Sequence, residues 1–154
     1  MTRTPVALAH DYLTQRGGAE RALLALGRAF PDAPLYTTVH EPTTTYGEFA
    51  EHELHTTPLQ RIGPLRRNPR LALPVLAPVV ERHRIDAEVT ICQSTGWSHA
   101  MPTSGIKIVY AHNTARWLYQ QDDYLANLPR FYRWGLAPFS PPLRRWDRRA
   151  AESA

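Results

Sequence analysis

Five short apolar runs rich in β-branched residues are spaced along the chain. Runs of this length, bounded by polar and turn-forming residues, are typical of buried strands. They cover residues 6–9, 35–39, 53–57, 88–92 and 106–110, of which 53–57 has the weakest pattern. The pattern therefore predicts five strands.

Helical patterns lie between these runs. Residues 19–30 place their apolar side chains on one face of a helix, and Pro31 ends it. Residues 70–83 predict a second helix, which Pro74 and Pro78 should kink or fray. Strands that alternate with helices indicate parallel β-α-β units, so the predicted fold class is α/β, with an open parallel sheet flanked by helices.

Prolines shape two further segments. Residues 58–69, which read PLQRIGPLRRNP, predict a long ordered loop. Residues 115–150 predict mostly helix, with breaks at Pro129, at Pro138 and at the Pro141–Pro142 pair.

Length and composition fit one globular domain. The chain has 154 residues, of which 43% are hydrophobic and 21% charged, and a chain of this size can bury a substantial core. No apolar run approaches the roughly 20 residues that span a bilayer, and His10 and Asp11 interrupt the first apolar patch before it reaches signal-peptide length. We therefore expect a cytoplasmic protein. Cys92 is the single cysteine, and its apolar surroundings predict a buried core side chain.

Polar side chains follow three of the predicted strands, at the edge where an open parallel sheet binds its ligands. They are His10 and Asp11 after the first strand, Ser94 and Thr95 after the fourth, and His112 and Asn113 after the fifth. The Gly17–Gly18 pair then opens the first helix, where glycine lets backbone N–H groups approach an anion that the helix dipole favours. The pair predicts a cradle for phosphate or sugar hydroxyls, and the alternative is a tight turn without a ligand.

Four motifs together resemble glycosyltransferase family 4, which contains retaining enzymes of GT-B architecture. HDYLTQRGGAER, FPDAPLYTTV, STGWSHAM and YAHNTARWLYQQDDYL occur here in the order and spacing seen in that family. The match looks closest to bacterial members that build polysaccharides and lipid-linked glycans, whose first half is a Rossmann-like acceptor-binding domain.

The resemblance implies roles for particular residues. Gly17 and Gly18 would lie against the donor diphosphate, and His112 would be the catalytic residue beside the transferred sugar. The candidates for acceptor binding are His10, Asp11, Ser94, Thr95, Asn113 and Arg116.

Each of these assignments has a structural alternative. His112 could be a strand-end histidine bonded to backbone, and His10 and Asp11 could satisfy the first loop. Arg116 could bind an acceptor phosphate or pair with Asp122 or Asp123.

His99 fits a helix-start or packing role better than a functional one. The histidines and carboxylates are too scattered for a zinc site, and no H-x-x-x-H or C-x-x-C spacing occurs, so we expect neither a metal nor another cofactor.

The resemblance also implies a second domain. Enzymes of this family hold the nucleotide in another Rossmann-like domain, with a glutamate-containing motif that these residues do not contain. We therefore expect residues 1–154 to form a single N-terminal domain that stops before its last strand. This domain would be the acceptor-binding half of a hexosyltransferase, which binds a nucleotide-sugar only together with a second domain. The alternative is a non-catalytic binding module derived from such a domain.

The net charge of +4 comes entirely from the C-terminal end. Residues 128–154 carry two acidic residues and six arginines, which are Arg130, Arg133, Arg144, Arg145, Arg148 and Arg149. Together with the aromatic residues Phe131, Tyr132, Trp134 and Trp146, they predict association with an anionic membrane surface, peripheral at the inner face. The alternative is a solvated helix face that packs against the missing strand in the complete protein. Nucleic-acid binding would need a basic stripe interleaved with aromatic residues on one sheet face, so we do not expect it.

Overall fold

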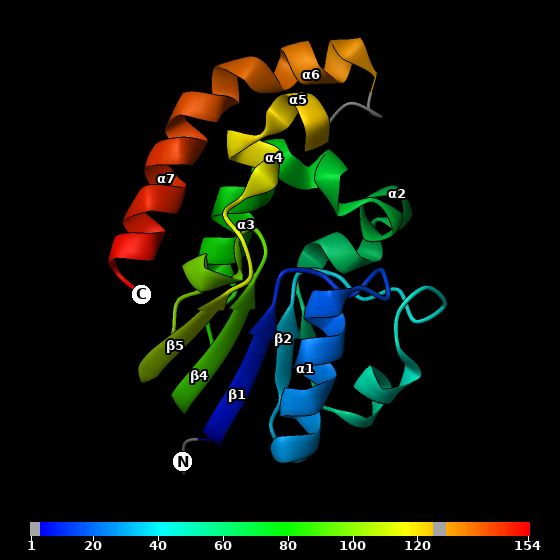
Figure 1. Cartoon of the computed structure of the whole chain (residues 1–154), viewed down its shortest axis with the longest axis vertical. Coiled ribbons are helices and arrows are strands. Elements are labelled where there is room, and N and C mark those ends of the chain that lie inside the picture. The colour runs from blue at the N-terminus through cyan, green and yellow to red at the C-terminus, as the bar shows by residue number, and fades with distance from the viewer. Residues whose placement is uncertain (1–3, 125–128) are drawn as a thin grey trace.

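The computed structural model describes residues 4–124 and 129–154 (Figure 1). Their centre is one five-stranded sheet in which every pairing is parallel. Its strands are β1 (Thr4–His10), β2 (Leu35–Thr37), β3 (Leu54–Thr56), β4 (Ala87–Ser94) and β5 (Ile106–Ala111). All five predicted strands are present, and the α/β class with a Rossmann-like open sheet is confirmed.

The strand order β3-β2-β1-β4-β5 places a topological switch point between β1 and β4. The chain builds outward from β1 to β3 on one side and then returns to add β4 and β5 on the other. In the β1–β4 register, His10 lies opposite Gln93. Open α/β sheets bind their ligands outside the carboxyl ends of the strands at such a point.

One face of the sheet is covered by α1 (Gly18–Ala29), as Figure 1 shows. Leu23 and Leu24 of this helix pack with Leu8 of β1 and Leu35 of β2. The predicted helix at 19–30 is therefore confirmed with a shift of one residue. On the same face, Ile106, Ile108 and Tyr110 of β5 remain exposed.

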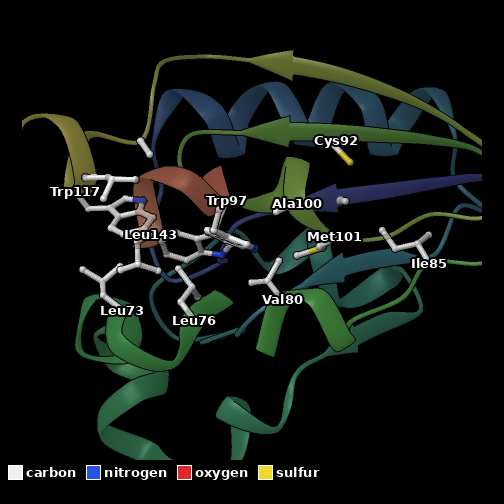
Figure 2. Packing of buried hydrophobic residues seen from close by; sticks show 14 of the residues in the cluster. Leu73, Leu76, Val80, Ile85, Cys92, Trp97, Ala100, Met101, Trp117 and Leu143 are labelled. Atoms are coloured by element: carbon white, nitrogen blue, oxygen red, sulfur yellow. The ribbon is translucent and has the colours of Figure 1, made fainter. Parts of the chain in front are cut away.

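The other face carries the larger core (Figure 2). Trp97 and Met101 pack there against Val80, Trp117 and Leu143, which come from three different helices. The elements that supply this core include η3 (Pro69–Val75), α3 (Leu76–Arg82), η4 (Ser98–Ala100), α4 (Arg116–Tyr119) and α7 (Ser140–Glu152).

Cys92 lies in this core, as predicted, and is fully buried. Burial raises the pKa of its thiol to about 12, so the thiol stays protonated at neutral pH. A protonated thiol is a poor nucleophile and a poor metal ligand.

Two segments before β4 differ from their prediction. The single helix expected at 70–83 is divided into η3 and α3, because Pro74 lacks the N–H that would continue a regular helix. The loop expected at 58–69 contains η2 (Pro58–Arg61) and α2 (Gly63–Arg67), each with a proline in its first turn. Proline is favoured there because the first N–H groups of a helix have no intrahelical partner. A further short helix, η1 (Gly47–Glu51), precedes β3.

The described residues from 116 onward are mostly helical, as predicted. After α4 come α5 (Gln121–Tyr124), α6 (Arg130–Leu136), η5 (Ala137–Phe139) and α7. The break expected at the Pro141–Pro142 pair was wrong, since both prolines lie in the first turn of α7. No helix in residues 4–124 and 129–154 is long and apolar enough to cross a membrane.

Gly105 provides a test of how closely β5 approaches β4. A Cβ atom at this position would collide with the carbonyl oxygens of Ala87 and Glu88, whereas a Cβ atom at Gly135 in α6 would meet open space. We predict that Gly105→Ala lowers the free energy of unfolding by about 2 kcal/mol or more. Gly135→Ala should instead raise it by about 0.5–1 kcal/mol, because alanine favours a helix interior. Urea unfolding of both variants measures the contrast, and equal free energies of unfolding for the two would contradict the close contact at Gly105.

Candidate functional site at the carboxyl edge of the sheet

The Asp11 carboxylate is the most highly connected side chain at this edge. Asp11 follows β1 directly and is fully buried. Its oxygens accept the backbone N–H groups of Thr95, Trp97 and Ser98 at 2.6–2.8 Å. The Thr95 hydroxyl donates a fourth hydrogen bond at 2.5 Å. These four donors surround the carboxylate, so Asp11 organises the loop after β4, and the Thr95 side chain is one of its partners.

His10 forms a buried ion pair with Glu20 of α1. His10 Nε2 lies 3.5 Å from Glu20 Oε1, and His10 Nδ1 donates to the Gln93 carbonyl at 3.0 Å. Burial alone would lower the pKa of His10, but the hydrogen bond to Glu20 and the charges of Asp11 and Glu20 outweigh it and raise that pKa. Burial likewise opposes ionisation of Glu20, yet its contacts with His10 lower the Glu20 pKa. Both groups are therefore stabilised in their charged forms.

Sequence reasoning missed Glu20. Its second carboxylate oxygen accepts the Gly17 N–H at 2.9 Å, which is one half of a helix capping box. The spacing Gly17-x-x-Glu20 carried this signal, but glycine cannot supply the hydroxyl that usually marks the motif.

The two glycines have different roles. A Cβ atom at Gly17 would lie 2.5 Å from Glu20 Oε2, so glycine is needed there for the carboxylate to fold back over the turn. Gly18 is the first residue of α1, is exposed, and has open space around its Cα. The first N–H groups of a helix lack intrahelical partners. Gly18, rather than Gly17, therefore presents the open N-terminal turn of α1.

His112 lies just beyond β5, as predicted, and is partly exposed. Its backbone N–H donates to the Ser94 carbonyl at 2.9 Å, and its Nε2 lies 3.1 Å from Gln93 Oε1. Burial lowers the pKa of His112, and the positive charge of His10 lowers it further. A neutral imidazole that donates from Nε2 to the Gln93 oxygen keeps Nδ1 as a hydrogen-bond acceptor.

Gln93 thus connects the two histidines. Its carbonyl accepts from His10, and its side-chain oxygen accepts from His112. The structure therefore joins Glu20, His10, Gln93 and His112 in one continuous polar network at the switch point.

The Ser94 side chain does not join this network. Its hydroxyl lies 3.0 Å from Nδ1 of His99, and His99 Nε2 lies 3.2 Å from an Asp147 oxygen on α7, with poor hydrogen-bond geometry. Tyr119 donates to the other Asp147 oxygen at 3.0 Å. Ser94, His99 and Asp147 line a largely apolar pocket of about 230 Å³ against α7. His99 is buried, in agreement with the expected packing role.

Asn113 and Arg116 lie exposed beside the edge. The Asn113 amide, with its nitrogen turned toward the backbone, donates to the carbonyls of Thr95 and Thr114. Arg116 Nε donates to Gln120 one turn later in the chain, at 3.2 Å. The side chain of Asp122, one of the expected partners of Arg116, lies outside the described residues.

Metal ligands do not cluster in the described part of the chain. No group of three or more histidine, cysteine, aspartate or glutamate side chains there could hold a metal ion.

Comparisons of the chain with protein-family models, with curated proteins and with solved structures found no match.

Removal of the Asp11 carboxylate should be costly. Asp11→Ala leaves three backbone N–H groups without their acceptor, and each such loss costs about 1–3 kcal/mol. We predict that the free energy of unfolding falls by about 3 kcal/mol or more in urea unfolding. Asp32→Ala removes an exposed carboxylate after α1 and should change it by less than about 0.5 kcal/mol. Similar values for the two variants would show that Asp11 does not hold this edge together.

The His10–Glu20 pair should make stability depend on pH. The raised pKa of His10 contributes stability below its ordinary value of 6.5, and this is lost as pH rises through the folded pKa. The lowered pKa of Glu20 contributes stability above its ordinary value of 4.5, and this is lost as pH falls through the folded pKa. The stability difference between the parent and Glu20→Gln should therefore be largest between pH 4.5 and 6.5.

Urea unfolding across a pH series measures this profile. Glu53→Gln is the matched control, because it breaks a solvent-exposed contact with His55 at 3.1 Å and should change stability little at any pH. A stability difference between the parent and Glu20→Gln that does not change with pH would contradict the charged pair.

Proposed function

We propose that this chain is the acceptor-binding half of a retaining glycosyltransferase of family 4. The enzyme would transfer a hexose from a nucleotide-sugar to a glycan or a lipid-linked acceptor. The observation that carries the proposal is the neutral, partly exposed His112 at the carboxyl edge, held by Gln93 of the switch-point strand β4. The four sequence motifs, one of which contains His112, also favour this family.

A neutral imidazole suits the position beside a transferred sugar. The transition state of retaining transfer resembles an oxocarbenium ion, and a cationic histidine next to it would raise its energy. Neutral His112 can instead accept a hydrogen bond from a sugar hydroxyl at Nδ1 while Gln93 fixes the ring. Such orientation of the reactants lowers the barrier without any proton transfer.

The charges around α1 suit a diphosphate. Glu20 lies under the turn at the start of α1, where an uncompensated carboxylate would repel an anion. His10 compensates this charge inside the protein. The open turn at Gly18 can then bind a donor phosphate through backbone N–H groups at the positive end of the helix dipole.

A non-catalytic binding module is the alternative that uses the same edge. In such a module, His112 would bind a glycan without any effect on chemistry. The module would be favoured over the transferase if loss of His112 abolished glycan binding while the parent protein showed no transferase turnover.

The catalytic assignment predicts the effect of His112→Ala. In an enzyme that unites this chain with a nucleotide-binding domain, we expect turnover to fall by about 10² or more, as expected for loss of a transition-state partner. The free energy of unfolding should change by less than about 1 kcal/mol, because His112 is partly exposed.

His52→Ala is the matched control for that measurement. His52 contacts the Ala33 carbonyl at 3.0 Å, before β2 and therefore at the opposite end of the sheet, and its loss should leave turnover unchanged. Parental turnover in His112→Ala would remove His112 from the catalytic site.

A further inference from the structure

Exposed aromatic side chains gather on α6 and η5. Phe131 is 76% exposed, Trp134 is 72% exposed and Phe139 is 43% exposed. Phe131 and Trp134 are three residues apart and so share one side of α6. Leu136 of the same helix is buried in the core. The helix is therefore anchored by one side and presents large apolar rings on the other.

The same helical arc carries all six C-terminal arginines. Arg130 stacks over the Trp134 ring, with its guanidinium carbon 5.9 Å from the ring centre. On α7, Arg145, Arg148 and Arg149 are exposed and line a shallow hollow. The only carboxylate between Arg130 and Arg149 is Asp147, which is buried against His99 and Tyr119. The exposed charged side chains from Arg130 to Arg149 are therefore all cationic, and the exposed Glu152 follows in the last turn of α7.

We propose that this aromatic–arginine face, formed by Phe131, Trp134 and Phe139 with Arg130, Arg145, Arg148 and Arg149, docks on the surface of an anionic lipid bilayer. Aromatic rings bind at the headgroup level, and cationic side chains are attracted by anionic headgroups. Figure 1 shows α6 and α7 as an arc on the outer rim of the molecule, where a flat surface can reach both helices.

Other occupants fit this face less well. A second copy of the chain would bring the arginines of this arc toward those of its partner, with Glu152 as the exposed carboxylate that each α7 offers to offset them. A nucleic acid would be bound best where aromatic rings and arginines line a groove along the strand, whereas Phe131 and Trp134 are exposed on a helix that lies on the outer rim.

Docking by this face would also orient the sheet. In Figure 1 the strands point toward the end of the molecule on which α6 lies. Docking there would turn the carboxyl edge toward the bilayer, which suits a lipid-linked acceptor. The link between this orientation and a lipid-linked acceptor rests on the proposed transferase function, whereas the docking itself does not.

Trp134 provides a specific probe of docking. The other three tryptophans, Trp97, Trp117 and Trp146, are at most 6% exposed, so a change in emission on binding reports Trp134. With vesicles of phosphatidylglycerol and phosphatidylcholine, we expect cosedimentation, a blue shift of the emission and protection from acrylamide. Binding should weaken at least tenfold between about 0.1 M and about 1 M salt, because the Debye length falls from about 10 Å to about 3 Å.

Variants separate this face from general charge attraction. Trp134→Phe should remove the blue shift and keep the cosedimentation. The triple change Arg145→Gln, Arg148→Gln and Arg149→Gln should weaken binding at least tenfold. The matched control changes the exposed Arg28, Arg82 and Arg84 in the same way and should bind like the parent.

Several results would overturn the proposal. They are equal binding to pure phosphatidylcholine vesicles, binding to neither vesicle type, and equal losses in the two triple variants. Unchanged Trp134 emission in a bound protein would overturn it as well. The assay contains no sugar donor, so its failure would leave the proposed role of His112 standing.

Discussion

The buried Asp11 carboxylate determines the geometry of the whole carboxyl edge. The carboxylate binds the loop after β4 at Thr95, Trp97 and Ser98. The backbone carbonyl of Asp11 accepts the N–H of Thr38, which lies just beyond β2, at 3.1 Å. Three segments that are far apart in sequence therefore meet at one residue. Gln93 lies just before the clamped loop, so the positions of both histidines that bond to it depend on the same carboxylate.

Electrostatic coupling gives the two histidines opposite properties. The hydrogen bond and charge of Glu20 raise the pKa of His10 and favour its charged form, whereas burial, helped by the positive charge of His10, lowers the pKa of His112. Burial by itself favours the neutral form of both rings, so the raised pKa of His10 depends on its charged neighbours, whereas burial is the main cause of the lowered pKa of His112. The negative charges of Asp11 and Glu20 act on His112 in the opposite direction and raise its pKa, but burial and the charge of His10 outweigh them.

The sequence predicted the elements better than the contacts between them. Periodicity located all five strands and α1, because burial on a sheet face or a helix face repeats with a fixed period. It could not show that Glu20 folds back onto Gly17, since that contact depends on the turn conformation. Successive strand residues point to opposite faces, so Ser94 meets His99 while Gln93 meets His112. The Pro141–Pro142 pair was misread because proline can begin a helix as well as end one.

The core connects the exposed aromatic rings of α6 and η5 to the polar carboxyl edge of the sheet. Leu143 and Trp146 of α7 and Leu136 of α6 pack in the same core as Trp97, which belongs to the loop that Asp11 holds. The aromatic–arginine face and the His10–His112 network are therefore parts of one packed unit rather than separate attachments. If that face lies on a bilayer, the bilayer fixes the direction of the sheet edge as well. An acceptor anchored in lipid would then reach His112 by diffusion in two dimensions, with its approach restricted by the protein's own orientation.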